Sequence, residues 1–187
     1  NIMYLGVDGG GTKTALALVD RAGNLLAQHL TGSSHYIASG MDSVRSMLRA
    51  AVQALLAKAA VPASAVESAF FGLPSYGEDS TLTGELDALP AACLPEGRYR
   101  CGNDMLCGWA GSLGGRDGIN VVAGTGSISY GEHGGVAARC GGWGELFSDE
   151  GSAYWIACRG LNLYSRMSDG RAPRGPLHQL LNERLKL

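Results

Sequence analysis

Three consecutive glycines separate two apolar runs near the start of the chain, in the stretch YLGVDGGGTKTALALVD. Glycine weakens a strand and loses more conformational freedom on folding than any other residue. A tight turn needs one or two glycines, so a third, followed by Thr12 and Lys13, indicates a turn whose backbone another group approaches closely. The residues after the turn are typical of strands, which predicts an antiparallel hairpin over residues 2–20.

The same strand–turn–strand pattern occurs again in the second half of the chain. Two sets of three strands are predicted, over residues 2–7, 14–20 and 25–30 and over 119–123, 128–130 and 136–139. Further strands are predicted over 66–73 and 99–101. The recurrence indicates an internal duplication of an α/β fold with mixed sheets. The glycine-rich stretch GSLGGRDG lies between the two sets, so we expect an N-terminal domain over 1–115 and the start of a second over 116–187.

Apolar residues at helical spacing predict the helices that flank these antiparallel meanders. The predicted helices cover residues 41–60, 80–89, 103–113, 148–170 and 176–187. In the fourth of these, Ser148 or Asp149 is expected to cap the first turn and Gly170 to end the helix.

Composition excludes several classes of protein. Apolar residues make up 45% of the 187 residues and charged residues 17%, which predicts a packed core rather than disorder. The formal net charge of −2, without a Lys/Arg stripe, argues against nucleic acid as a partner. No apolar run is long enough for a membrane span, and we expect no signal peptide. Five cysteines without a Cys-x-x-Cys pair favour a reducing, cytoplasmic location. The oligomeric state stays open, a homodimer included.

The first glycine turn has the residues of an anion site. It lacks the spacing of a Walker A loop, but a glycine turn between antiparallel strands can direct successive N–H groups, here those of Gly10 and Gly11, at a phosphate. Thr12 and Lys13 would add a hydroxyl and an ammonium donor, and Asp8 would hold Mg²⁺ through water. An ordinary hairpin with spare glycines explains the same residues equally well.

A second turn of this kind, Gly124, Thr125 and Gly126, lies in the stretch AGTGSIS. Taken alone it is also explained by a hairpin loop. Two hydroxyl-bearing glycine turns, one in each half of a duplicated fold, would hold a polyphosphate from both sides if they faced each other across a cleft.

Between the two turns, Asp104 falls in the first turn of a helix that follows a strand. The helix dipole favours the ionised carboxylate there, and such a group can accept the proton of a substrate hydroxyl during phosphoryl transfer. A helix-capping aspartate is the alternative, and position alone does not separate the two.

The stretch RCGGWGELFSDEGSAYW supplies candidates for a ligand contact. Trp143 lies between Gly142 and Gly144, where a ligand could reach the bare backbone, and Asp149 could accept hydrogen bonds from sugar hydroxyls. A core tryptophan and a helix-capping aspartate explain these residues at least as well. Ser34 and His35 in the stretch GSSHY are further candidates for the same cleft, with loop caps as the alternative.

Four of these motifs occur in the same order in a known family. GVDGGGTKT, ND, GTGS and GGWG with DEGSAYW make the chain resemble the N-acetylglucosamine kinases of the BadF/BadG/BcrA/BcrD ATPase family, within the superfamily of sugar kinases, actin and heat-shock chaperone ATPases. The resemblance implies a pair of ribonuclease-H-like, actin-like ATPase domains around a deep cleft. Members of this family continue well beyond residue 187, so the resemblance also implies a fragment whose second domain is incomplete.

The resemblance further implies a reaction, the transfer of phosphate from MgATP to the 6-hydroxyl of N-acetylglucosamine or glucosamine, with Asp104 as the catalytic base. The implied ATP-phosphate ligands are Gly10, Gly11, Thr12, Lys13, Gly124, Thr125 and Gly126, with Asp8 near Mg²⁺. The implied sugar ligands are Ser34, His35, Asp104, Gly142, Trp143, Gly144 and Asp149. Two alternatives are an ATPase that activates an iron–sulfur dehydratase or reductase, and a non-catalytic sugar-binding domain.

Overall fold

The computed structural model describes residues 2–186, and the chain folds as two compact units. Unit 1 is Asn1–Gly114 and unit 2 is Gly115–Leu187. The division falls one residue before the domain boundary expected from the sequence, which stays a prediction. None of the helices within residues 2–186 combines the length and apolar character needed to cross a membrane.

Unit 1 is built on a five-stranded mixed sheet in the order β3-β2-β1-β4-β5. The strands are β1 (Met3–Asp8), β2 (Thr14–Asp20), β3 (Leu25–Thr31), β4 (Val66–Leu73) and β5 (Tyr99–Asn103). The first three form an antiparallel meander, and β4 and β5 add to β1 in parallel. The strand predictions for this half of the chain are confirmed to within two residues at each end.

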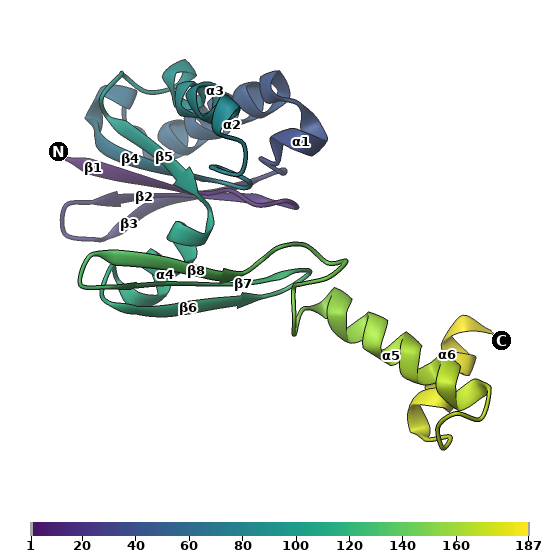
Figure 1. Ribbon diagram of the computed structural model, residues 1–187. Coiled ribbons are helices and arrows are strands. Elements are labelled where there is room, and N and C mark those ends of the chain that lie inside the picture. The colour runs from purple at the N-terminus through teal and green to yellow at the C-terminus, as the bar shows by residue number, and fades with distance from the viewer. Residues whose placement is uncertain (1, 187) are drawn as a thin grey trace. The chain divides into compact units, whose positions relative to one another are not determined.

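Helices cover one face of this sheet (Figure 1). They are the short α1 (Tyr36–Ser39), α2 (Met41–Ala59) and α3 (Thr83–Ala88), with short 3₁₀ turns at Ala63–Ala65, Ser80–Leu82 and Leu89–Ala92. Alternate residues of β1 are buried beneath them, and α2 presents a buried apolar stripe at helical spacing that includes Val44, Leu48 and Leu55. Because β1 alternates strictly, Asp8 points to the face away from this core.

Three parallel strands, β1, β4 and β5, end at the same edge of the sheet. Their carboxyl ends lead into the first glycine turn after Asp8, the segment from Pro74 onward, and α4 (Met105–Leu113). In open α/β sheets such an edge is where ligands bind. The topology therefore brings Asp8 and Asp104, which are far apart in the sequence, to one edge of unit 1.

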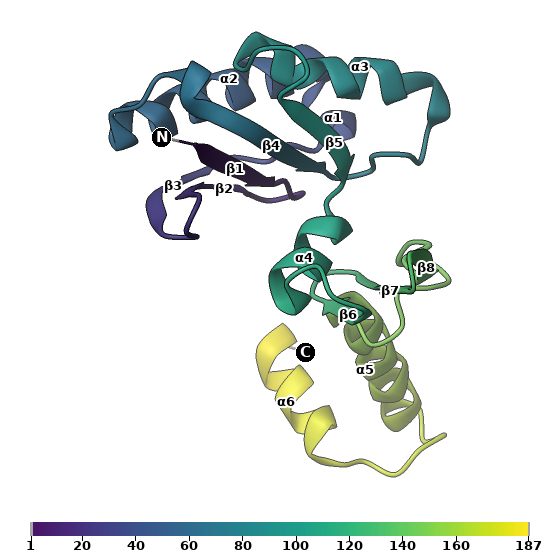
Figure 2. The same cartoon turned by 90° about the vertical axis from the view of Figure 1, so that its left-hand side faces the viewer.

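Unit 2 begins with a second antiparallel meander, β6 (Gly118–Ala123), β7 (Ser127–His133) and β8 (Val136–Gly141). It continues with α5 (Ala153–Ser168) and α6 (Pro176–Leu185), and α6 folds back beside α5 (Figure 2). The Tyr164 hydroxyl donates to Asn182 Oδ1 over 2.5 Å, and the Tyr164 and His178 rings stack. These contacts hold the two helices together.

The predicted start of α5 was wrong. The helix begins at Ala153 rather than at residue 148, and Ser152 is its N-cap, because Ser152 Oγ accepts from the Trp155 N–H over 3.1 Å. Asp149 and Gly151 have φ values of 55° and 80°, so the chain cannot be helical through this stretch. Neither Ser148 nor Asp149 therefore caps the helix.

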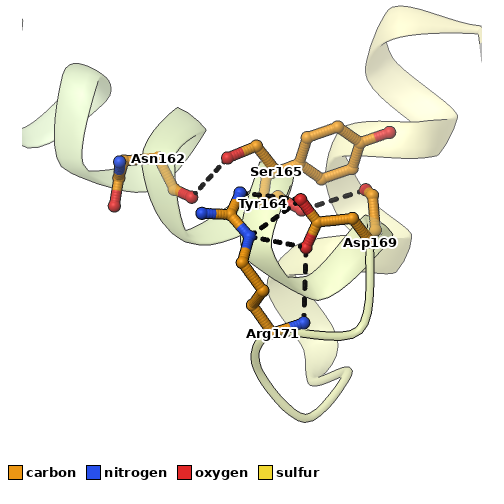
Figure 3. Close-up of polar contacts among 6 residues, drawn as sticks. Asn162, Tyr164, Ser165, Asp169 and Arg171 are labelled. Carbon is orange, nitrogen blue, oxygen red and sulfur yellow. Dashed lines mark hydrogen bonds and ion pairs between the residues drawn. The ribbon is translucent and has the colours of Figure 1, made fainter.

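The other end of α5 agrees with the prediction that Gly170 ends it. The last helical residue is Ser168, and Gly170 has a φ of 84°. Just beyond the helix, the Asp169 carboxylate accepts from the backbone N–H and the guanidinium of Arg171 (Figure 3). Asp169 therefore stabilises the turn that leads toward α6.

Candidate active site

The first glycine turn, residues 9–13, is held by two neighbouring segments of unit 1. On one side the Gly9 N–H donates to the Gly72 carbonyl at the end of β4, over 2.8 Å. On the other side the Gly10 carbonyl accepts from the Ser34 N–H and from the Ser33 hydroxyl, each over 3.2 Å. The turn is thus fixed to the sheet edge and to the loop that follows β3.

The three glycines of this turn differ in the space that a side chain would have. A Cβ at Gly9 would lie 2.4 Å from both the Gly72 carbonyl oxygen and Ser34 Oγ, and a Cβ at Gly10 would lie 2.8 Å from the Lys13 carbonyl oxygen. A Cβ at Gly11 would meet nothing within 4 Å. Packing within the protein therefore requires the first two glycines, and the third borders open space.

The backbone of this turn offers a row of hydrogen-bond donors. Within residues 2–186, the N–H groups of Gly10, Gly11, Thr12 and Lys13 have no hydrogen-bond partner in the protein. Successive free N–H groups of this kind attract an anion, and the Thr12 hydroxyl and Lys13 ammonium are exposed beside them. The turn can therefore accept a phosphate without rearranging any bond it already makes.

Asp104 lies at the start of α4 without capping it. Its side chain makes no capping hydrogen bond, since Asn103 Oδ1 accepts from the Met105 N–H over 3.1 Å. The capping alternative from the sequence is therefore excluded for Asp104. Its carboxylate remains available to a ligand at the sheet edge.

The pKa of Asp104 moves in the opposite direction to the one the helix dipole predicts. Burial raises it, and the negative charge of Asp8 raises it further, while the neighbouring backbone N–H groups of Met105 and Asp104 lower it and only partly offset these two causes. Burial also raises the pKa of Asp8, and the charge of Lys13 partly opposes that shift. Two mutually repelling carboxylates at one edge favour binding of a cation or a proton.

A magnesium ion fits Asp8 only in an indirect way. Residues 2–186 contain no group of three or more His, Cys, Asp or Glu side chains that could hold a metal by themselves. Mg²⁺ commonly keeps several waters and is bound by one or two carboxylates together with substrate phosphates. Asp8, beside the free N–H groups of the turn, suits that form of binding.

Close packing sets the position of α4, and the sequence analysis did not identify the residue that allows it. A Cβ at Gly72 would lie 2.5 Å from Cys107 Sγ and 3.1 Å from Asp104 Cα. Burial raises the pKa of the Cys107 thiol to about 12, so the thiol stays protonated and acts as a packing group. A glycine at the end of a predicted strand, directly before Leu73 and Pro74, was the available signal for a close approach.

Ser34 and His35 lie near the first turn but are not equivalent. The Ser34 side chain is 1% exposed, and its hydroxyl packs against Gly9 with no hydrogen-bond partner in the described part of the chain. The expected sugar contact from Ser34 has no access to a ligand in this geometry. His35 Nε2 lies 3.3 Å from the hydroxyl of Ser75, which follows the end of β4, so His35 lies at the same edge as Asp104.

In unit 2, Asp149 links the second glycine turn to the tryptophan loop. A Cβ at Gly126 would lie 2.6 Å from Asp149 Oδ2, and Asp149 Oδ1 accepts from the Gly144 N–H over 3.2 Å. The Gly124 carbonyl accepts from the Ala153 N–H over 2.9 Å, which connects the turn to the start of α5. The predicted Gly124, Thr125, Gly126 and Gly142–Gly144 segments therefore meet around one buried carboxylate.

The tryptophan of this loop does not pack in a core. Trp143 is 70% exposed, and the Arg139 guanidinium lies over its ring at 5.3 Å from the centroid. The φ values of Gly142 and Gly144 are 69° and 103°, which only glycine adopts readily, so the loop brings bare backbone to both sides of the ring. Trp143 therefore lies outside the cores that residues 2–186 form.

The structure thus assembles the predicted site residues as two groups. One group, in unit 1, contains Asp8, Gly10, Gly11, Thr12, Lys13, His35 and Asp104. The other, in unit 2, contains Gly124, Thr125, Gly126, Gly142, Trp143, Gly144 and Asp149. Convergence of the two groups on one ligand stays a prediction.

The profile of the BadF/BadG/BcrA/BcrD ATPase family matches residues 5–186. The chain belongs to this family. It is 29% identical over 194 residues to the N-acetyl-D-glucosamine kinase of Dictyostelium discoideum, covering 99% of the chain and 61% of that protein. It is 30% identical over 185 residues to the N-acetylmuramic acid/N-acetylglucosamine kinase of Clostridium acetobutylicum, covering 98% and 60%.

A solved structure agrees with this membership. A Chromobacterium violaceum protein, provisionally described as an N-acetylglucosamine kinase, superposes with a TM-score of 0.76 at 29% identity and covers 97% of the chain and 63% of that protein. The predicted α/β, actin-like fold class is confirmed. The chain spans about three-fifths of the length of the curated relatives it matches.

Proposed function

We propose that the chain is the catalytic base-bearing part of an ATP-dependent amino-sugar kinase that phosphorylates N-acetylglucosamine at its 6-hydroxyl. The observation that carries the proposal is the row of four unpartnered N–H groups, Gly10 to Lys13, at the sheet edge that also holds Asp8 and Asp104. The two curated relatives, which are kinases of N-acetylglucosamine, support the choice of substrate class. A cytoplasmic location, expected from the cysteines, belongs to the same proposal.

In this reaction the first glycine turn binds the phosphates of ATP. The free N–H groups and the Lys13 ammonium offset the charge that the phosphate oxygens carry, and they are already in place before the ligand arrives. Asp8 would hold Mg²⁺ through water, and the ion would supply positive charge to the phosphate oxygens. Thr125, Gly124 and Gly126 bind phosphate from unit 2.

Asp104 accepts the proton of the sugar 6-hydroxyl. The burial that raises its pKa makes it a stronger base than an exposed carboxylate, because proton affinity and pKa rise together. His35 at the same edge, and Gly142, Trp143, Gly144 and Asp149 in unit 2, hold the sugar. The exposed Trp143 ring suits stacking on a sugar face, and the bare backbone beside it suits hydrogen bonds to hydroxyl groups.

Replacing Asp104 tests the base directly. We expect Asp104→Asn to lower kcat about 100- to 10,000-fold, as loss of a general base does, while the affinity for N-acetylglucosamine changes no more than a few-fold. A coupled ATP-consumption assay with N-acetylglucosamine, glucosamine and N-acetylmuramic acid measures both quantities. The assay uses the longest natural polypeptide that carries these residues, because the chain spans about three-fifths of its curated relatives. Normal turnover in the variant would contradict the assignment, and absence of sugar-dependent ATP consumption in the parent would contradict the kinase itself.

No observation within residues 2–186 favours the iron–sulfur alternative. Cys93, Cys101 and Cys107 are partly buried thiols whose pKa values burial raises to about 11, 12 and 12. Only Cys140 and Cys158 are exposed among the cysteines. The sugar-binding alternative differs from the kinase only in lacking ATP consumption, so the same assay separates the two.

A further inference from the structure

The Gly10 carbonyl is unusual within the first glycine turn because two donors hold it from one side. The Ser34 N–H and the Ser33 hydroxyl both donate to it over 3.2 Å. The Ser33 hydroxyl has one proton, and its oxygen already accepts from the His35 N–H over 3.1 Å. Because the oxygen is the acceptor in that bond, the hydroxyl proton is donated to the Gly10 carbonyl oxygen.

Holding this carbonyl also orients the next N–H. The Gly10 carbonyl and the Gly11 N–H belong to one planar trans peptide unit, in which the two groups point in opposite directions. Because the carbonyl points to the loop at residues 33–34, the Gly11 N–H points away from it. The Gly11 N–H has no hydrogen-bond partner among residues 2–186, so it is available to a ligand.

The sequence makes such support necessary. A peptide unit between two glycines rotates more freely than any other, since neither flanking residue has a Cβ to restrict it. Without an anchor the Gly10–Gly11 unit would sample orientations in which its N–H does not face the ligand. Ordering it on binding would then weaken affinity for an anion.

We propose that Ser33 is a positioning residue for the phosphate site, acting through the Gly10 carbonyl to direct the Gly11 N–H at the anion. The proposal rests on the proposed function in one respect, that the turn of residues 9–13 binds the phosphates of ATP. Ser33 itself does not touch the ligand. The neighbouring Ser34 contributes its backbone N–H to the same carbonyl, and this bond survives any change of the Ser33 side chain.

The experiment is a titration of the ¹⁵N-labelled polypeptide of the kinase assay with inorganic tripolyphosphate, followed at the amide signals of Gly10 to Lys13 by NMR. Tripolyphosphate is the probe because it needs only the turn and no adenine or sugar pocket. We expect Ser33→Ala to weaken binding at these signals about fivefold, as loss of one neutral hydrogen bond predicts. Ser33→Thr keeps the hydroxyl and is expected to restore binding to within about twofold.

Ser46→Ala is the matched control, because Ser46 is an exposed residue in the second turn of α2, and this variant should bind as the parent does. Equal binding by Ser33→Ala and the parent overturns the role of Ser33 alone. Absence of any shift at Gly10 to Lys13 in the parent overturns the phosphate site and the role of Ser33 together. If Ser33→Ala does not fold, Ser33→Cys gives the same comparison, since its thiol keeps the volume and donates only weakly.

Discussion

The two antiparallel meanders of this protein have the same strand order but are supported in different ways. In unit 1, β1 pairs with both β2 and β4, and its inward side chains Met3, Leu5 and Val7 lie under α2. In unit 2, β6 pairs only with β7 among the described residues, and Ile119 and Val121 of β6 are 73% and 66% exposed. Within residues 2–186, the sheet of unit 1 is therefore covered by helices of its own unit, and the face of β6 that carries Ile119 and Val121 is not.

The difference extends to how each half of the candidate site is held. The turn of unit 1 is anchored on a sheet edge that a large apolar core supports. The segments of unit 2 meet around buried polar side chains, since Ser148, Asp149 and Ser152 make up most of the buried residues described there. Among the described residues, packing therefore holds the turn of unit 1, and individual hydrogen bonds hold the segments of unit 2.

The largest expected contrast comes from one leucine in each unit. Leu55 in α2 is fully buried, whereas Leu161 in α5 is half exposed. We expect Leu55→Ala to lower the free energy of unfolding by about 2–5 kcal/mol and Leu161→Ala by less than about 1 kcal/mol. Urea unfolding with the amide signals of α2 and α5 resolved by NMR measures both. Equal losses would show that the two units are supported alike.

A smaller contrast is expected between the two glycine turns. Gly9→Ala should lower the free energy of unfolding by about 1–3 kcal/mol, because its Cβ would meet the Gly72 carbonyl oxygen at 2.4 Å. Gly124→Ala should change it by no more than about 0.5 kcal/mol, because a Cβ there meets nothing within 4 Å. Thermal unfolding followed by circular dichroism compares them, and a larger loss for Gly124→Ala would contradict the assigned packing.

The smallest contrast concerns pH and one aspartate in each unit. The pKa of Asp104 is raised above its ordinary value of 3.8 by burial and by Asp8, so its ionisation disfavours the folded state above the raised pKa and has no effect below 3.8. The pKa of Asp169 is lowered by hydrogen bonds from Arg171, so its ionisation favours the folded state above 3.8, and this gain is lost as the pH falls through the lowered pKa.

Replacing each aspartate by asparagine should therefore change the stability of its unit in opposite directions at neutral pH. We expect Asp104→Asn to raise the urea midpoint of unit 1 and Asp169→Asn to lower that of unit 2, and both effects to fade on acidification. Urea titrations across the acidic range, read at amides of each unit, measure them. An Asp169→Asn variant that is more stable than the parent would contradict a stabilising role for the ionised Asp169. An Asp104→Asn variant that is less stable would contradict the destabilising effect of the ionised Asp104.

Much of the fold was predictable from short-range patterns. The alternation of β1 and the helical spacing in α2 each depend on residues a few positions apart, and both elements were predicted to within one residue. The start of α5 was not predicted correctly, because Ser148, Asp149 and Ser152 are all residue types that cap helices well. Backbone dihedrals at Asp149 and Gly151 decide among them, and those depend on what Asp149 contacts across the loop.

The sequence by itself determined the residue types of the candidate site and the turns that carry them, because residue type alone fixes which donors, acceptors and backbone freedom a position offers. Only the tertiary structure decided that Ser33 rather than Ser34 directs its hydroxyl at the first turn, and that burial outweighs the helix dipole at Asp104. The physical reason is distance along the chain. Gly10 contacts Ser33, and Gly72 packs against Cys107, only after the sheet has formed. These contacts, and the burial and charge that shift the pKa of Asp104, therefore exist only in the folded protein.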